Sequence, residues 1–178
     1  MIIGYSRTFP RVGPSWSTTF SESMTGLSTG WSGWDLRQVI NSSLLSASAT
    51  SLTRVTLQAP TSGGQGFTID HAYIGEQGAG NVWNFDGNQV PLTFSGSAGV
   101  TVPLNGTAVS DAVPFVLDRT KNLVLAFHFS AASSIAEQGA ITGTAGYGHS
   151  AADDTSVTSP SGYATQGSLF LVNKIEVE

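Results

Sequence analysis

The three histidines of this 178-residue chain, and the aspartates near one of them, are the side chains best suited to chemistry. His149 lies in the segment GYGHSAADD, close to Ser150, Asp153 and Asp154. A Ser–His–Asp set could be drawn from these residues, because catalytic triads are defined by geometry and not by sequence position. A triad also needs a strained, exposed nucleophile and an oxyanion hole, and no motif in the sequence indicates either. We therefore predict no catalytic residues, and keep a stand-alone hydrolase centred on His149 only as an alternative.

The other two histidines lie in segments of alternating hydrophobicity. His71 belongs to FTIDHAYI, where the alternation places it on one face with Phe67, Ile69 and Tyr73. His128 belongs to NLVLAFHFS, opposite the Leu and Phe residues of that segment. We predict that both are hydrogen-bonded residues of a β-sheet.

Hard oxygen ligands suited to calcium occur at Asp153–Asp154 and at Asp86-Gly87-Asn88. Neither has the dense alternating Asp spacing of a dedicated calcium loop. The Asp-Gly pair at 86–87 fits a tight turn instead, because glycine readily adopts positive φ. Cysteine is absent, which excludes disulfides and cysteine-based zinc sites. We assign no metal site and no cofactor.

Aromatic residues in polar segments suggest contact with sugars, whose apolar faces stack on Trp or Tyr while polar side chains bind the hydroxyls. The polar segment 144–167 is long for a loop, and loops of this length are usually functional or disordered. A second candidate turn is GNVWNFDGNQ at residues 80–89. The candidate carbohydrate-binding residues are Trp83, Tyr147, His149, Asp153, Asp154 and Tyr163.

Residues 1–34 predict an extended N-terminal arm, because Pro, Gly and Ser interrupt any regular hydrophobic pattern. We expect its aromatic side chains to pack on the chain's own sheet or on a neighbouring subunit. An alternative use of the tryptophans at 31 and 34 is sugar stacking. The candidate docking residues are Phe9, Trp16, Phe20, Trp31 and Trp34.

Residues 35–178 predict one antiparallel β-sandwich domain, a jelly roll of about eight strands. Only 11% of residues are charged, and short alternating segments recur between Gly-, Asn- and Asp-rich turns. The segment 133–140 predicts one short helical turn. The expected strands are 36–41, 52–58, 67–74, 91–94, 99–104, 113–117, 122–130 and 168–177.

Charge and hydropathy exclude several classes of partner. The net charge is −5, and the seven basic residues form no cluster that could neutralise a phosphate backbone, so we expect no nucleic-acid partner. The apolar runs are too short to cross a membrane, and the first residues lack the apolar region of a signal peptide. We expect no membrane insertion and no classical export.

Four segments, in order along the chain, carry a resemblance to a known family: WDLRQVINSSL, LTRVTLQAPTSGGQGFTIDHAYIG, LTFSGSAGVTVPLNGTAVSDAVPFVLDRTKNLVLAFHFS and SLFLVNKIEVE. They resemble the jelly-roll accessory domain that lies N-terminal to the catalytic domain of bacterial SGNH/GDSL-type hydrolases. The likeness spans Trp34 to Glu178. The Gly-Asp-Ser and Asp-x-x-His motifs of the catalytic domain have no counterpart in the sequence. The resemblance thus implies a jelly roll without hydrolase activity.

These observations predict a non-enzymatic structural protein of a virion surface, such as a bacteriophage decoration, fibre or tail-attached jelly roll, that contacts host surface glycans. Its expected partners are other virion subunits through the arm, further copies of the same chain, and surface polysaccharide. The alternative is a carbohydrate-binding module working with a separate hydrolase. In that case the expected location is bacterial, secreted or on the cell surface by a non-classical route.

Overall fold

The computed structural model describes residues 13, 15–139, 141–150, 153–167 and 169–178, so the candidate docking residue Phe9 lies outside the described residues. These residues form strands and one short 3₁₀ helix, and no helix among them is long and apolar enough to cross a membrane. The elements are β1 (Ser17–Ser21), β2 (Gly26–Thr29), β3 (Asp35–Ile40), η1 (Ser42–Leu44), β4 (Thr53–Gln58), β5 (Phe67–Glu76), β6 (Val90–Leu92), β7 (Val100–Val102), β8 (Thr107–Val109), β9 (Leu123–Ala131), β10 (Ser134–Gln138), β11 (Thr144–His149), β12 (Ala164–Gly167), β13 (Leu169–Phe170) and β14 (Val172–Val177).

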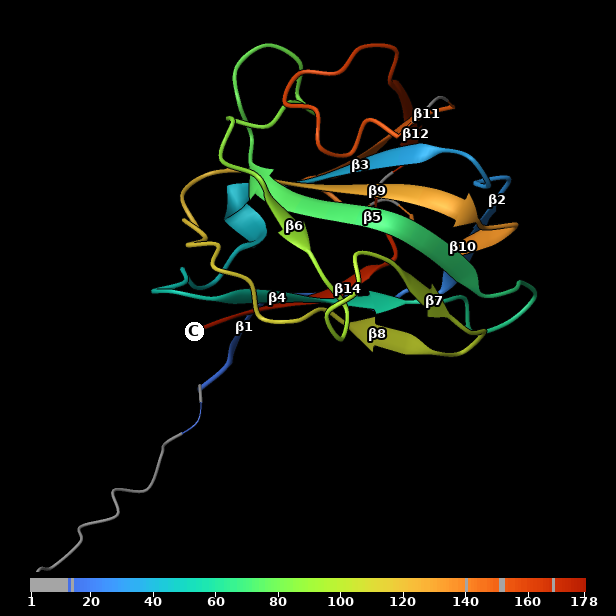
Figure 1. Cartoon of the computed structure of the whole chain (residues 1–178), viewed down its shortest axis with the longest axis horizontal. Helices are drawn as coiled ribbons and strands as arrows, with labels where there is room; N and C mark the ends of the chain where they lie inside the picture. The colour runs from blue at the N-terminus through green and yellow to red at the C-terminus, as the bar shows by residue number, and fades with distance from the viewer. Residues whose placement is uncertain (1–12, 14, 140, 151–152, 168) are drawn as a thin grey trace, which may run out of the picture.

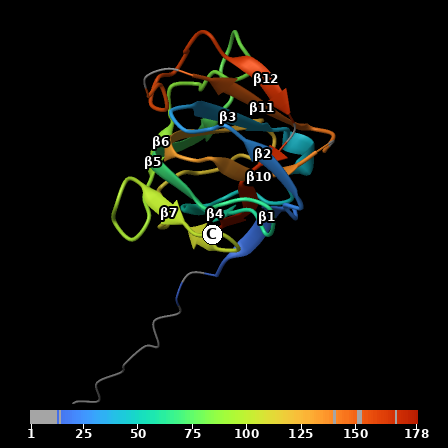
Figure 2. The same ribbon diagram turned by 90° about the vertical axis from the view of Figure 1, so that its right-hand side faces the viewer.

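Antiparallel sheets face each other across the core (Figure 1). One sheet has the strand order β1-β14-β4-β8, and the larger one has the order β12-β11-β3-β9-β5-β6, with β7 also paired to β5. A third sheet, β13-β10-β2, lies at one end of the sandwich, facing the viewer in Figure 2. The predicted all-β antiparallel sandwich is confirmed. The jelly-roll topology stays a prediction.

The central strand β9 shows how sequence alternation becomes two buried faces. Leu125, Phe127 and Phe129 point into the core between the sheets, as the period of two predicts. Val124 and Ala126 point to the outer face of the larger sheet and are also fully buried. They are covered because the loops 77–89 and 153–163 lie over this face, at the top of Figure 1.

The segment predicted to be an arm contributes two strands to the sandwich. β1 pairs with β14, and β2 pairs with β10. Phe20 and Trp31 are core residues, and the Trp31 ring lies 5.2 Å from the Phe170 ring and 5.8 Å from the Phe129 ring. Residues 17–34 therefore belong to the sandwich and not to a separate arm. Their strands are short, of five and four residues, and so show little periodicity in the sequence.

The remaining two tryptophans of this segment lie at the edge of the fold. Trp34 is half-buried against the core, with its ring 5.9 Å from that of Trp31. Trp16 is half-buried over the Arg54 guanidinium, whose central carbon lies 4.3 Å from the ring centroid. Neither residue offers a fully exposed ring for docking.

Most of the segment predicted to be a helical turn, Ser134–Gln138, forms strand β10 instead. Ser134–Gln138 pairs with β2 on one side and with β13 on the other. Pairing on both edges satisfies the backbone hydrogen-bonding groups of β10. This outweighs the weak local preference of the segment for a helical turn.

The Ser-Asp pair at 110–111 links the two sheets. The Ser110 hydroxyl accepts a hydrogen bond from the Val55 amide of β4, at 2.9 Å. The Asp111 carboxylate accepts from the Gly96 amide at 2.8 Å and from the Thr93 hydroxyl at 2.7 Å, in the connection between β6 and β7. These hydrogen bonds, the one from Gly96 foremost, lower the pKa of Asp111. The pair therefore has a structural role: it joins β4 to the connection between β6 and β7.

Candidate functional site

All three histidines lie in one row across the outer face of the larger sheet. His149 of β11 is the cross-strand partner of Asp35 on β3. Asp35 is in turn the partner of His128 on β9, and His128 that of His71 on β5. Cross-strand partners share a face of a sheet and lie about 5 Å apart, so the four side chains are immediate neighbours.

A β-bulge between Ile69 and His71 places His71 in this row. Without the bulge, His71 would share the inner face with Phe67 and Ile69, as the alternation in the sequence predicted. The extra residue reverses the alternation, and His71 emerges on the outer face with its side chain 51% exposed. The prediction that His71 shares a face with Phe67 and Ile69 is therefore wrong.

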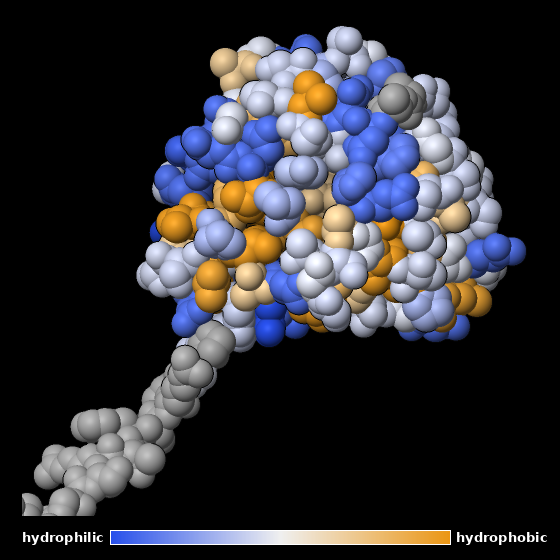
Figure 3. All heavy atoms as spheres, in the orientation of Figure 1, coloured by the Kyte–Doolittle hydropathy of each residue, from blue (hydrophilic) through white to orange (hydrophobic). Residues whose placement is uncertain are grey.

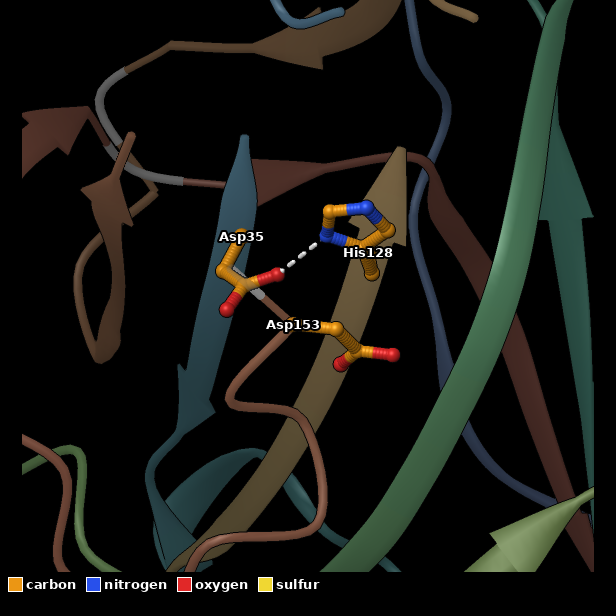
Figure 4. Close-up of side chains that lie close together, drawn as sticks. All are labelled: Asp35, His128 and Asp153. Carbon is orange, nitrogen blue, oxygen red and sulfur yellow. Dashed lines mark hydrogen bonds and ion pairs between the residues drawn. The ribbon is translucent and has the colours of Figure 1, made fainter. Parts of the chain in front are cut away.

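Each histidine of the row pairs with an aspartate. His128 Nδ1 lies 2.7 Å from Asp35 Oδ1, and Figure 4 shows the ring pointing at that carboxylate. His71 Nδ1 forms a short hydrogen bond with Asp153 Oδ2. The prediction that these two histidines are hydrogen-bonded sheet residues is confirmed. His149 Nδ1 lies 3.5 Å from Asp154 Oδ2, which is an ion-pair distance without good hydrogen-bond geometry.

The second oxygen of each carboxylate in the first two pairs is held by the loop 153–163. Asp35 Oδ2 accepts from the Asp154 amide at 2.6 Å. Asp153 Oδ1 accepts from the Thr155 amide at 2.9 Å and from the Thr155 hydroxyl. Both carboxylates are thus fixed in orientation, with one oxygen bound to the backbone and the other facing an imidazole.

Burial separates the pKa values of these two aspartates. Asp35 is fully buried, and desolvation raises its pKa despite the hydrogen bonds from the Asp154 amide and His128. Burial also acts to raise the pKa of Asp153, but the hydrogen bonds from Thr155 and His71 outweigh it and lower the value. Asp153 is the more accessible of the two carboxylates.

Arg37 lies two residues along β3 from Asp35, on the same face, and is fully buried. Its Nη2 donates to the carbonyls of Asp154 and Val157, each at 2.7 Å. Its guanidinium carbon lies 4.3 Å from the centroid of the Phe85 ring, a cation–π distance. Desolvation lowers the pKa of Arg37. One cation under the loop therefore fixes two of the loop's carbonyls to the sheet.

Three aromatic rings gather beside the histidine row. The Trp83 ring centroid lies 5.1 Å from that of Tyr147 and 6.0 Å from that of Tyr163. Tyr163 is buried, and burial raises its pKa. Trp83 and Tyr147 are half-buried, so each keeps part of its surface open to solvent. Tyr163 supports the pair from within and offers little surface to a ligand.

The two loops over this face are also bonded to each other. Trp83 Nε1 donates to the Pro160 carbonyl at 3.1 Å, and the Phe85 amide donates to the Thr158 carbonyl at 2.9 Å. Gln89 Nε2 donates to the Ser156 carbonyl at 2.8 Å. In Figure 3 the upper part of the molecule shows hydrophilic patches among residues of near-neutral hydropathy, with a smaller hydrophobic spot. The loops form a cover held by hydrogen bonds.

The structure brings together all six predicted carbohydrate-binding residues, although Trp83 comes from a different loop. The sequence did not predict the roles of Asp35 and Arg37. Their signal was available: both charges fall on the same face of the strand DLRQVI, whose residues are all buried. The turn prediction at 86–87 is confirmed, since Gly87 has φ +101° and the Asn88 amide donates to the Asp86 carboxylate.

The chemistry available at this face is binding, proton exchange and metal coordination. Asp35, His128 and Asp153 each offer one ligand atom, and these atoms lie within 4.8 Å of one another (Figure 4). Within the described part of the chain, no histidine is hydrogen-bonded to a Ser or Thr hydroxyl. A nucleophile activated by an imidazole is therefore not seen among these residues.

Two hollows lie away from the histidine row. One of about 390 Å³ is at the end of the sandwich near the third sheet and is lined by residues such as Ser32, Gln65, Thr101 and Ser133. Another of about 280 Å³ is lined by Glu76, Val116 and Lys121 among others. Neither is lined by a member of the row.

Comparison with known proteins adds no relationship to these observations. No known family model matches the chain, and no curated protein is similar to it in sequence. The resemblance to the accessory domain of SGNH/GDSL-type hydrolases accordingly stays a prediction.

Proposed function

We propose that this protein is a non-enzymatic β-sandwich that binds glycans through the surface formed by loops 77–89 and 153–163. The observation that carries the proposal is the half-exposed pair Trp83 and Tyr147, whose rings lie 5.1 Å apart on a rigid base. Sugars stack their apolar faces on such rings. The pair offers two adjacent platforms, which suits a chain of sugar units.

The polar groups around the pair support a sugar ligand over a purely apolar one. His149 and Asp154 are each about a quarter to a third exposed, and lie beside the aromatic rings. Their imidazole and carboxylate can bind sugar hydroxyls. The Trp83 ring is already fixed through its hydrogen bond to Pro160. The free-energy cost of ordering this surface on ligand binding would therefore be small.

Affinity electrophoresis of the purified protein in gels carrying different bacterial surface polysaccharides tests this function. Retardation by one of them is expected, with a loss of at least roughly tenfold in affinity for Trp83→Ala and for Tyr147→Ala. Trp16→Ala is the matched control, because Trp16 is equally half-buried but packs on Arg54 of β4. Unchanged retardation in both site variants, or no retardation by any polysaccharide, would overturn the proposal.

The setting that we propose is the surface of a virion-type particle, where the chain would be a decoration, fibre or tail-attached subunit. Support comes from the sandwich fold, by analogy with such subunits, and from a composition that is poor in charge and lacks cysteine. A docking role for the aromatic residues has less support, because Phe20 and Trp31 belong to the core. Labelling of purified particles with an antibody against this protein tests the setting.

The second candidate is a carbohydrate-binding module that works with a separate hydrolase. The same Trp83–Tyr147 surface favours it, since the surface binds sugar in both cases. Antibody labelling separates the two: signal on cell envelopes or on a co-purifying hydrolase, with none on particles, would favour the module.

A further inference from the structure

We propose that Asp35, His128 and Asp153 form a binding site for a single divalent transition-metal ion of the zinc type, with His71 beside them as a fourth ligand. The site shares the loop 153–163 with the glycan surface, but it includes neither Trp83 nor Tyr147 and does not depend on glycan binding. The four residues come from four different segments, namely β3, the neighbouring strands β9 and β5, and the loop 153–163.

The donor set matches this class of metal. Imidazole nitrogen is a borderline ligand and carboxylate oxygen a hard one; zinc and its neighbours accept both, whereas calcium and magnesium prefer oxygen alone. The ligand atoms of Asp35, His128 and Asp153 lie within 4.8 Å of one another. Zinc ligands at about 2.0–2.2 Å in a tetrahedron are roughly 3.3–3.6 Å apart, so side-chain shifts of about 1 Å complete the geometry.

The surroundings of the two carboxylates are those of metal ligands. Metal-binding carboxylates are usually oriented by hydrogen bonds to their other oxygen. Asp35 Oδ2 is held by the Asp154 amide at 2.6 Å, and Asp153 Oδ1 by the Thr155 amide at 2.9 Å. Asp35 Oδ1 and Asp153 Oδ2 remain, and each faces an imidazole Nδ1. One ion at this point would take the place of the hydrogens in both His–Asp hydrogen bonds.

Charge also favours a cation. Asp35 is fully buried, and the carboxylate of Asp153 lies close to it. Arg37, the nearest buried cation on β3, is directed at the loop carbonyls and the Phe85 ring. Two converging carboxylates, one of them fully buried, are costly unless positive charge compensates them. A divalent ion supplies that charge and ties the loop 153–163 to β3 and β9.

Calorimetric titration of the full-length protein, first treated with a chelator and then freed of it, tests the site. With ZnCl₂, each chain is expected to bind one Zn²⁺ ion with a Kd of roughly micromolar or tighter. With CaCl₂, it is expected to bind Ca²⁺ at least about tenfold more weakly. CoCl₂ is expected to give a visible absorption band, and Zn²⁺ to raise the Tm by several degrees. Absence of Zn²⁺ binding, or preference for Ca²⁺, would overturn the proposal.

Two variants locate the ion. Asp153→Asn and His128→Ala are each expected to weaken Zn²⁺ binding by roughly 100-fold or more. Asp111→Asn is the matched control for the carboxylate, since Asp111 also accepts hydrogen bonds from loop amides but lies away from the row. His71→Ala serves if the buried His128 variant does not fold, because the His71 side chain is half-exposed. Equal losses in Asp111→Asn, or none in Asp153→Asn, would contradict the site.

Discussion

The two faces of the larger sheet are both buried, but by different means. On the inner face, Phe127 and its neighbours pack against apolar side chains of the opposite sheet. On the outer face, Asp35 and Arg37 hold loop backbone through hydrogen bonds of 2.6–2.7 Å. Apolar contact is non-directional, while each hydrogen bond requires one partner in one position. We infer that the inner face stabilises the fold and that the outer face positions the loops.

The largest effect is expected from the inner face. Phe127→Ala removes a fully buried ring at the centre of the sandwich and leaves a cavity. We expect the free energy of unfolding to fall by about 3–5 kcal/mol, measured by urea denaturation. Fluorescence and circular dichroism should follow one shared transition, because the whole sandwich loses support. A loss below about 1 kcal/mol would contradict a core role for this face.

Arg37→Met is expected to act locally. It keeps the apolar volume under the loop but removes two hydrogen bonds to the carbonyls of Asp154 and Val157. The free energy of opening the loop should fall by about 2–4 kcal/mol, because bonds from a charged donor are the strong ones. Native-state hydrogen exchange at the amides of loop 153–163 measures this free energy of opening. The amides of β9 should keep most of their protection.

Arg54→Met is the control for that variant. Arg54 is partly exposed and pairs with Glu176 and the Trp16 ring, away from the loops. Its loss should cost less than about 1 kcal/mol and leave the loop amides unchanged. The same exchange pattern in both variants would contradict a specific role for Arg37.

Asp111 allows the same comparison away from the histidine row, since its carboxylate also fixes a loop. Its pKa is lowered in the folded state, so its contribution to stability is present above the pKa of the unfolded chain, about 3.9. That contribution is lost as the pH falls through the lower folded value. As the pH is lowered from 5 to 2, the urea concentration at the midpoint of unfolding should therefore decrease more steeply for the wild type than for Asp111→Asn. Parallel pH profiles for the two proteins would show that the Asp111 carboxylate contributes nothing to stability.

The smallest effect on stability is expected from His149→Ala. The imidazole is partly exposed and lies 3.5 Å from Asp154 without a good hydrogen bond. Loss of such a pair should change the free energy of unfolding by less than about 1 kcal/mol. Glycan retardation should nevertheless fall, since His149 borders the aromatic pair. A Tm drop of many degrees would show instead that His149 is part of the structural cover.

The fold class could be read from the sequence because long strands keep their alternation. β9 and β3 were recognisable from the runs LVLAFHFS and DLRQVI. β1, β2 and β10 were not, because they are five residues or shorter and are stabilised by pairing with distant strands. Non-local pairing leaves little local signal.

The candidate site could be predicted only in part, for a similar reason. The polar segment 144–167 and Trp83 were identified from composition, and they do lie together. The row of His149, Asp35, His128 and His71 depends on the register of four strands and on one bulge. A shift of one residue in any pairing would have sent a side chain to the other face. No sequence pattern specifies that register.

The most direct test of the account is to map where a glycan binds. An oligosaccharide cut from a retarding polysaccharide would be titrated into isotope-labelled protein, and amide chemical shifts followed by NMR. The account predicts that the shifts cluster on β11 and on the loops around Trp83 and Tyr147. Shifts confined to the hollow near Gln65 and Thr101, at the end of the sandwich, would contradict it.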